Sequence, residues 1–145
     1  MSMIYMYDIE LIKNNMENIY NKIPEFECNH CHKCCGPIIW FQIEEILMEN
    51  FMKKHKIENV KWTTEDFKEN DMKCPFLKDD RCSIYEVRPI VCRLQGNVPD
   101  LPCRFNKNGF MSEGSIKKIK KDFYELNKKF QGDNIFYSTR KMTKI

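Results

Sequence analysis

The sequence predicts a small, mainly α-helical single domain with a few short strands. Three observations lead to this fold class. The chain has 145 residues, enough for one domain with a modest hydrophobic core. Apolar residues recur at three- and four-residue steps in three stretches, which is the spacing of one helix face. All eight cysteines lie between Cys28 and Cys103, so one part of the chain is set apart by its composition.

The first amphipathic helix is predicted over residues 8–22. Asp8 suits the N-cap position, and Pro24 is expected to stop the helix soon after residue 22. We expect the apolar face of this helix to pack in the core rather than to bind a partner. That face is formed by Ile9, Ile12, Met16, Ile19 and Ile23.

Two further helices are predicted by the same periodicity. The second covers roughly residues 42–55 and ends in basic residues, which complement the helix dipole. The third covers residues 112–131 and is followed by Gly132, a residue typical of the position after a helix. Its apolar positions are Ile116, Ile119, Phe123, Leu126 and Phe130.

The chain between these helices predicts short elements. A brief helix is expected after Thr63 or Thr64, because a threonine followed by acidic residues is typical of a helix cap. A small hairpin is expected around residues 78–81, with Cys74 and Cys82 on its two arms. A helical turn should start at Pro89. The last thirteen residues are expected either to dock as an extended tail or to fray.

The predicted organisation is one domain over residues 1–145. It comprises an N-terminal helix within 1–24, a cysteine-cluster metal-binding region over 26–104, and a basic C-terminal helix over 112–131 with a short tail. Residues 106–145 carry ten Lys or Arg against four Asp or Glu. We interpret this charge as a solvated helix face. Nucleic-acid binding through it is a less favoured alternative.

The cysteines are expected to be reduced. The longest apolar run, residues 38–41, is too short to span a bilayer, and the N-terminal residues lack the pattern of a secretory signal. We therefore expect a cytoplasmic protein without membrane contact. Eight cysteines in a reducing compartment indicate metal ligands, and four disulfides are the less favoured alternative.

The cysteines predict a metal core that staples the domain. The upstream motif is Cys28-x-x-Cys31-x-x-Cys34-Cys35, and the downstream thiols are Cys74, Cys82, Cys92 and Cys103. Paired C-x-x-C steps aim two thiolates at one metal. The side chains of consecutive residues such as Cys34 and Cys35 diverge, so we expect them to serve different centres unless one is not a ligand. Eight thiolates divide into two sets of four, the number that tetrahedral zinc or a four-iron cluster requires.

The spacing favours iron–sulfur ligation over zinc. Three closely spaced cysteines resemble the start of a bacterial ferredoxin motif, although the fourth follows directly instead of after three residues. We expect one or two 4Fe–4S clusters, with zinc as the alternative. His30 and His32 are expected to donate hydrogen bonds near the thiolates or to be exposed, and His55 to lie at a helix end. A catalytic thiol at Cys31 would leave seven cysteines unexplained.

Four arginines lie within four residues of a downstream cysteine: Arg81, Arg88, Arg93 and Arg104. A thiolate-rich centre carries negative charge, so nearby guanidinium groups would stabilise it and tune its potential. Salt bridges to Asp79, Asp80 and Glu86 are an equally good explanation of these arginines.

The chain resembles the YkgJ-like cysteine-cluster family over roughly residues 26–93. The resemblance rests on the upstream motif, on residues 74–77 (Cys-Pro-Phe-Leu) and on residues 82–93 (Cys-Ser-Ile-Tyr-Glu-x-Arg-Pro-x-x-Cys-Arg). It implies a zinc- or iron-chelating domain with seven of the eight cysteines in the shared motif, and Cys103 lies beyond it. Flagellin lysine methylases, which are much longer proteins, look like they contain a related cysteine cluster. This sequence has no Gly-rich strand–turn–helix for S-adenosylmethionine, so that activity is not transferred.

We therefore expect an iron–sulfur protein that transfers electrons or assists a protein partner in a redox or maturation complex. The alternative is a zinc-stapled module that binds a protein or nucleic acid. An enzyme with an open metal site ranks last, because no carboxylate–histidine constellation supports it. We do not expect the chain to be an enzyme by itself.

Overall fold

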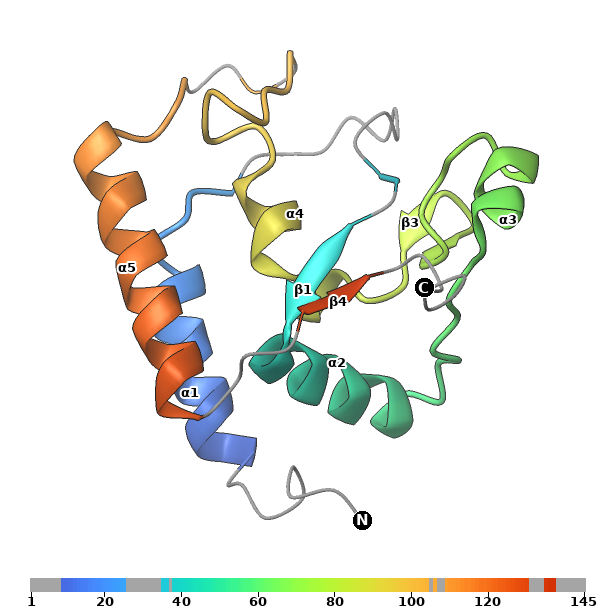
Figure 1. Ribbon diagram of the computed structural model, residues 1–145, viewed down its shortest axis with the longest axis horizontal. Helices are drawn as coiled ribbons and strands as arrows, with labels where there is room; N and C mark the ends of the chain where they lie inside the picture. The colour runs from blue at the N-terminus through green and yellow to red at the C-terminus, as the bar shows by residue number, and fades with distance from the viewer. Residues whose placement is uncertain are drawn as a thin grey trace, which may run out of the picture.

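The computed structural model describes residues 9–25, 35–36, 38–104, 106 and 109–130, and the backbone of residues 135–137. This part of the chain is mainly helical, as predicted (Figure 1). The α-helices are α1 (Ile9–Tyr20), α2 (Gln42–Lys54), α3 (Thr64–Glu69), α4 (Ile90–Leu94) and α5 (Glu113–Lys129), with a 3₁₀ turn η2 (Tyr85–Val87). The strands are β1 (Ile39–Phe41), β2 (Leu77–Lys78), β3 (Arg81–Cys82) and β4 (Ile135–Tyr137).

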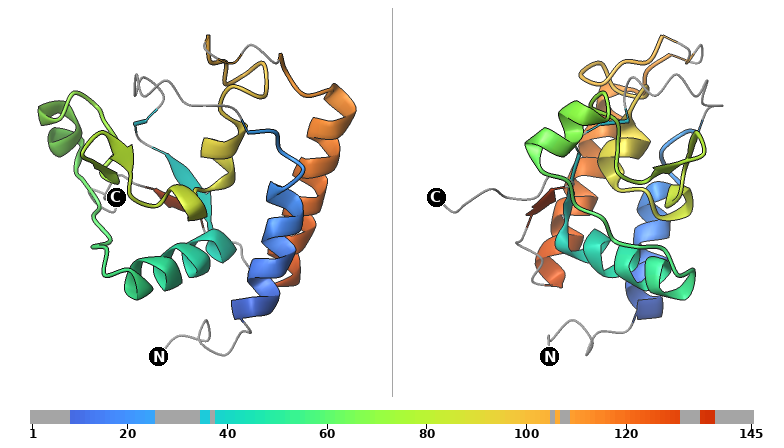
Figure 2. Two further views of the ribbon diagram at one scale, coloured as in Figure 1. Left: turned by 180° about the vertical axis from the view of Figure 1, so that it is seen from behind. Right: turned by 90° about the vertical axis from the view of Figure 1, so that its right-hand side faces the viewer.

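The first and last helices lie side by side and run in opposite directions (Figures 1 and 2). Their predicted apolar faces are the faces that meet, since each contributes buried residues to one hydrophobic cluster. The helix caps explain the start of α5, where the hydroxyl of Ser112 accepts a hydrogen bond from the backbone N–H of Ser115 at 3.1 Å. We call this cluster, which also takes in residues of α2 and α4, the helical core. Its α1 and α5 members are Ile12, Met16, Ile19, Ile119, Phe123 and Leu126.

A second hydrophobic cluster lies beneath the β2–β3 hairpin, and we call it the hairpin core. It contains Trp40, Met48, Met52, Phe76, Ile84 and the buried thiol residue Cys74. The amphipathic pattern of α2 explains why there are two cores: Ile43, Ile46 and Leu47 face the helical core, whereas Met48 and Met52 face the hairpin core. Helix α2 therefore forms a wall that both cores share.

The last described segment of the chain returns to β1 and forms a two-stranded sheet with it. Strand β1 pairs with β4 in antiparallel register, with Trp40 opposite Phe136. Two alternatives were predicted for the C-terminal tail, a docked extended segment or a frayed end. Residues 135–137 are docked as a strand. The remaining tail residues lie outside the described part of the chain. Among the described residues, no helix is long and apolar enough to cross a membrane.

The short elements agree with the sequence in most details. Thr63, rather than Thr64, caps α3: its hydroxyl accepts from the backbone N–H of Asp66 at 3.1 Å, and the Asp66 carboxylate accepts from the N–H of Thr63 at 3.0 Å. The hairpin turn uses Asp79 and Asp80, both with positive φ, which suits a two-residue turn between antiparallel strands. The hairpin is shorter than predicted, since Cys74 precedes β2 and only Cys82 lies in a strand.

Candidate metal centre

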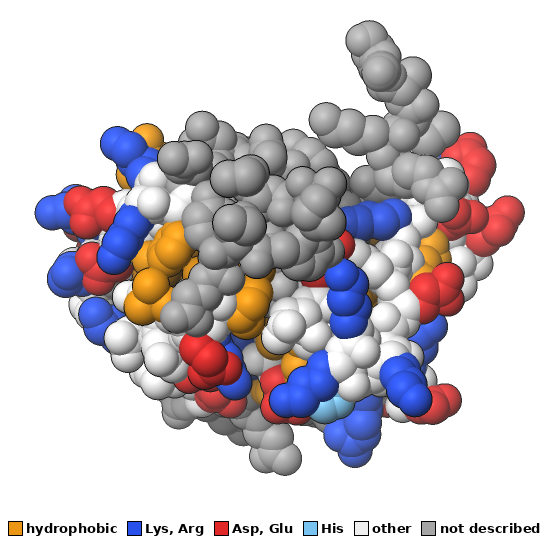
Figure 3. All heavy atoms as spheres, turned by 90° about the horizontal axis from the view of Figure 1, so that it is seen from below, with side chains coloured by type: hydrophobic (Ala, Val, Ile, Leu, Met, Phe, Trp, Pro, Cys, Tyr) orange, Lys and Arg blue, Asp and Glu red, His pale blue; other side chains and the backbone are white. Residues whose placement is uncertain are grey.

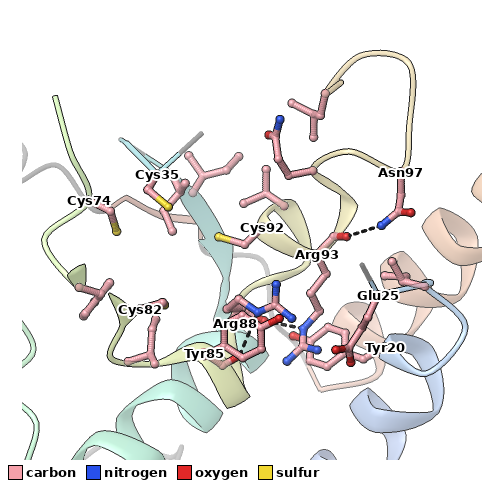
Figure 4. A pocket seen from close by; sticks show the side chains of 18 of the residues that line it. Tyr20, Glu25, Cys35, Cys74, Cys82, Tyr85, Arg88, Cys92, Arg93 and Asn97 are labelled. Carbon is pink, nitrogen blue, oxygen red and sulfur yellow. Dashed lines mark hydrogen bonds between the residues drawn. The ribbon is translucent and has the colours of Figure 1, made fainter. Parts of the chain in front are cut away.

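Four of the predicted ligand residues line one cavity of about 340 Å³. They are Cys35, Cys74, Cys82 and Cys92, and they come from four separate parts of the chain. Figure 4 shows these cysteines toward one end of the cavity, with Arg88, Arg93 and Tyr20 toward the other. The fold therefore brings an upstream thiol and three downstream thiols to the same space.

Gly36 explains how Cys35 reaches the downstream cysteines. A Cβ atom at position 36 would lie 2.9 Å from the backbone oxygen of Met72, a distance that real Cβ atoms essentially never show. Only glycine lets the two backbones approach this closely without a shift. Because Met72 is two residues before Cys74, this contact holds the segment of Cys35 beside the segment of Cys74.

The hairpin positions Cys74 and Cys82. The backbone oxygen of Cys74 accepts from the N–H of Leu77 at 3.1 Å, and Leu77 lies opposite Cys82 in the β2–β3 ladder. Burial raises the pKa of the Cys74 thiol to about 11. A hydrogen bond from the Phe76 backbone opposes that rise, and a neighbouring Cys82 thiolate adds to it.

Helix α4 carries Cys92, and its first turn is set by Pro89, whose carbonyl accepts from the N–H of Cys92 at 3.0 Å. Burial raises the pKa of the Cys92 thiol strongly, and the charges of Cys74 and Cys82 raise it further. These three thiols therefore lie close enough to influence one another. A bound cation would offset both the burial cost and the mutual repulsion, so metal binding here would be coupled to loss of the thiol protons.

The other predicted site residues divide into two groups. Cys103 and His55 are described but are not among the residues that line the cavity, and the His55 ring stacks on Phe51 with centroids 4.2 Å apart. The remaining ones lie outside the described residues: Cys28, Cys31, Cys34, His30 and His32. Within the described ranges, no three or more Cys, His, Asp or Glu side chains are arranged so that they could hold a metal ion. The Cys-ligated core thus stays a prediction.

Arg88 and Arg93 line the cavity, whereas Arg81 and Arg104 do not. The Nε of Arg88 donates to the backbone oxygen of Tyr85 at 3.0 Å, and its guanidinium lies over the Tyr85 ring at 3.8 Å. Arg93 donates from Nε to the Arg88 oxygen at 2.8 Å and from Nη2 to the Glu86 backbone oxygen at 2.9 Å. In the described part of the chain neither arginine forms an ion pair with a carboxylate. The salt bridge considered for Glu86 is thus replaced by a bond to its main chain.

A buried carboxylate that is hydrogen-bonded to Tyr20, a residue of the cavity lining, was not anticipated from the sequence. Glu44 is 1% exposed and accepts three hydrogen bonds: from the Tyr20 hydroxyl at 2.7 Å, from the Phe41 N–H at 3.1 Å and from the Ile90 N–H at 2.5 Å. It therefore links α1, β1 and the start of α4, which carries Cys92. Burial raises the pKa of Glu44 to about 7, and these hydrogen bonds only partly oppose the rise.

The sequence contains only a weak indication that Glu44 is buried. Two adjacent glutamates, Glu44 and Glu45, interrupt an otherwise apolar stretch at the start of α2, and such acids are usually read as exposed helix-dipole partners. Both are buried, and Glu45 accepts from the indole N–H of Trp40 at 2.6 Å.

The comparisons agree with the cysteine pattern. The family CxxCxxCC, described as "Putative zinc- or iron-chelating domain", matches residues 27–129. No curated protein and no solved structure matches the chain. The family match includes the upstream motif, all four cavity cysteines, Cys103 and the whole of α5, and it spans more than half of the chain. The chain therefore belongs to the CxxCxxCC family of cysteine-cluster, metal-chelating domains.

Proposed function

We propose that this protein binds an iron–sulfur cluster and transfers electrons, or assists a protein partner in a redox or maturation complex. The observation that supports this most is the convergence of Cys35, Cys74, Cys82 and Cys92 on one cavity. Thiolates are the usual ligands of such clusters, and the family match supports metal binding. The donor chemistry also fits one or two 4Fe–4S clusters when the upstream motif is included.

The surroundings of the thiols suit a redox centre. A cluster supplies a one-electron couple when bound, and its potential depends on nearby charge, hydrogen bonds and solvent access. Cys74 packs in the hairpin core with Phe76 and Ile84, so water is excluded from one side. Arg88 and Arg93 add positive charge at the other end of the cavity, which would stabilise a negative thiolate centre. We propose a cytoplasmic setting, where the thiols stay reduced.

The alternative is a zinc-stapled module without redox chemistry that binds a protein or nucleic acid. The family description names both metals. Helix α5 exposes lysines, including Lys120 and Lys121, that would meet an acidic partner. Others are paired with acids of the same helix, such as Lys118 with Asp122 at 2.9 Å. Basic and acidic side chains are also interspersed over the face in Figure 3, so nucleic-acid binding remains the less favoured use.

Metal and acid-labile sulfide analysis of protein purified without oxygen tests this proposal. We expect a brown sample in which iron and sulfide are present in equal amounts, and in which dithionite reversibly bleaches the visible absorption. About four irons per chain would indicate one four-iron cluster, and about eight would indicate two. A colourless sample that contains zinc but no sulfide would refute the redox proposal and favour the zinc module.

A further inference from the structure

We propose that the arginine end of the cavity binds a small organic carboxylate with an apolar body, and that Arg88 is the residue that recognises the carboxylate. The proposal rests on this end of the cavity alone. It does not depend on which metal the cysteines hold.

The first observation is that Arg88 is fixed in position by one of its guanidinium nitrogens, while its two terminal nitrogens can still donate hydrogen bonds. Its Nε donates to the Tyr85 backbone oxygen, and its guanidinium carbon lies 3.8 Å from the centroid of the Tyr85 ring. The two terminal nitrogens have no hydrogen-bond partner among the described residues. A guanidinium group fixed at Nε presents its terminal N–H groups as a fork, which matches the two oxygens of a carboxylate.

The second observation is the charge of the cavity wall. Arg93 lies beside Arg88 on that wall and is anchored to the Arg88 and Glu86 backbone oxygens and stacked on the Tyr20 ring at 3.7 Å. The carboxylate that faces them among the lining residues is Glu25, an exposed side chain that forms no ion pair with either arginine. The buried Glu44 carboxyl also acts on Arg93, but burial raises its pKa to about 7. Two guanidinium groups therefore leave this end of the cavity net positive at neutral pH and below.

The third observation concerns the remainder of the lining. The rest of the cavity lining is largely apolar and includes Ile23, Ile38, Ile84, Val91 and Leu101. The whole cavity, cysteine end included, has a volume of about 340 Å³, at the lower end of the range of roughly 300–1,000 Å³ for small-molecule pockets, so the arginine end has room only for a small ligand. Apolar walls with a few fixed polar groups are typical of such pockets. An inorganic oxyanion would leave these walls without a contact, whereas an apolar body would cover them.

The probe for the test is 4-fluorobenzoate, followed by ¹⁹F NMR on the metal-loaded full chain, with the neutral 4-fluorobenzamide as a matched probe. We expect saturable binding of the benzoate, competition by hexanoate, and little binding of the amide. In Arg88→Gln the benzoate should bind roughly tenfold or more weakly, because a charged, two-point hydrogen bond is lost. Arg81→Gln is the control, since Arg81 is exposed and does not line the cavity.

Three results would overturn the proposal: no saturable binding of benzoate or hexanoate to the wild type, equal affinity in Arg88→Gln, or competition by inorganic phosphate as strong as that by hexanoate. If Arg88→Gln does not fold by circular dichroism, Arg88→Lys gives the answer. This variant keeps the positive charge but lacks the planar pair of N–H donors that matches a carboxylate, so weaker binding is again expected. Iron and sulfide are measured on the same samples. Benzoate binding without iron would refute only the redox proposal, and iron without benzoate binding would refute only this one.

Discussion

The buried Glu44 carboxyl should make the stability of this protein fall as the pH rises through neutrality. Burial raises its pKa from 4.5 to about 7 in the folded state. A carboxyl with a raised pKa binds its proton more tightly when the protein is folded. The stabilisation linked to that proton is therefore fully present below about pH 4.5 and is lost as the pH rises through about 7.

The size of this effect follows from the two pKa values. Each pH unit between them is worth about 1.4 kcal/mol, so the whole rise corresponds to about 3 kcal/mol in the free energy of unfolding. Glu44→Gln removes the titrating group and keeps the shape. Its amide oxygen can accept from the Tyr20 hydroxyl and the Ile90 N–H, but its NH₂ then faces the Phe41 N–H, which costs about 1–3 kcal/mol at every pH.

Urea denaturation followed by circular dichroism at pH 5, 6, 7 and 8 measures the difference between wild type and Glu44→Gln. We expect the variant to be the less stable protein at pH 5 and the gap to shrink by about 2.5 kcal/mol by pH 8, because part of the total of about 3 kcal/mol is already lost at pH 5. Because both proteins carry the same cysteines, the pH dependence of the thiols cancels in the difference. Glu49→Gln removes the same charge from α2 and controls for net charge. A gap that is the same at pH 5 and pH 8 would show that Glu44 is not a proton-linked group.

The remaining expectations concern the cysteine cavity and the core. Cys92→Ser should lose most of the bound metal, whereas Cys103→Ser should lose much less because Cys103 does not line the cavity; elemental analysis compares them. Metal removal with a chelator should lower the melting temperature markedly in a thermal scan, since a metal site binds only the folded chain, and an unchanged midpoint would contradict a stapling role. Gly36→Ala should destabilise the fold and reduce metal content, because its Cβ would meet a backbone oxygen at 2.9 Å. Phe123→Ala should cost about 3–5 kcal/mol in urea, against less than about 0.5 kcal/mol for the exposed neighbour Tyr124→Ala.

The helices were predictable because their sequence signals are local. The stripe that contains Ile12 and Met16 is buried as expected, and the caps at Thr63 and Ser112 act within three residues of themselves. The predicted bounds of the long helices differ from the observed ones by one or two residues. Helix ends fray, and periodicity does not mark the last turn.

The long-range features were not predictable in the same way. The pairing of β1 with β4 joins segments that lie far apart in the sequence, and three-residue strands carry too little alternation to reveal a partner. The role of Glu44 depends on Tyr20 and Ile90, which reach it only in the folded protein. The cysteines were identified by type and spacing. Their meeting at one cavity depends on the Gly36 contact and the hairpin turn, neither of which spacing describes.

The shared wall formed by α2 has a consequence for how the protein opens. Since one face of this helix packs in the helical core and another in the hairpin core, neither core can separate while α2 keeps its other contacts. The two halves should therefore unfold in one cooperative step, with the backbone amides of α2 among the slowest to exchange with deuterium. Loosening the cysteine end should then speed amide exchange as far away as α1 and α5. A ligand or metal that binds at one end should therefore slow the opening of both cores, because α2 connects them.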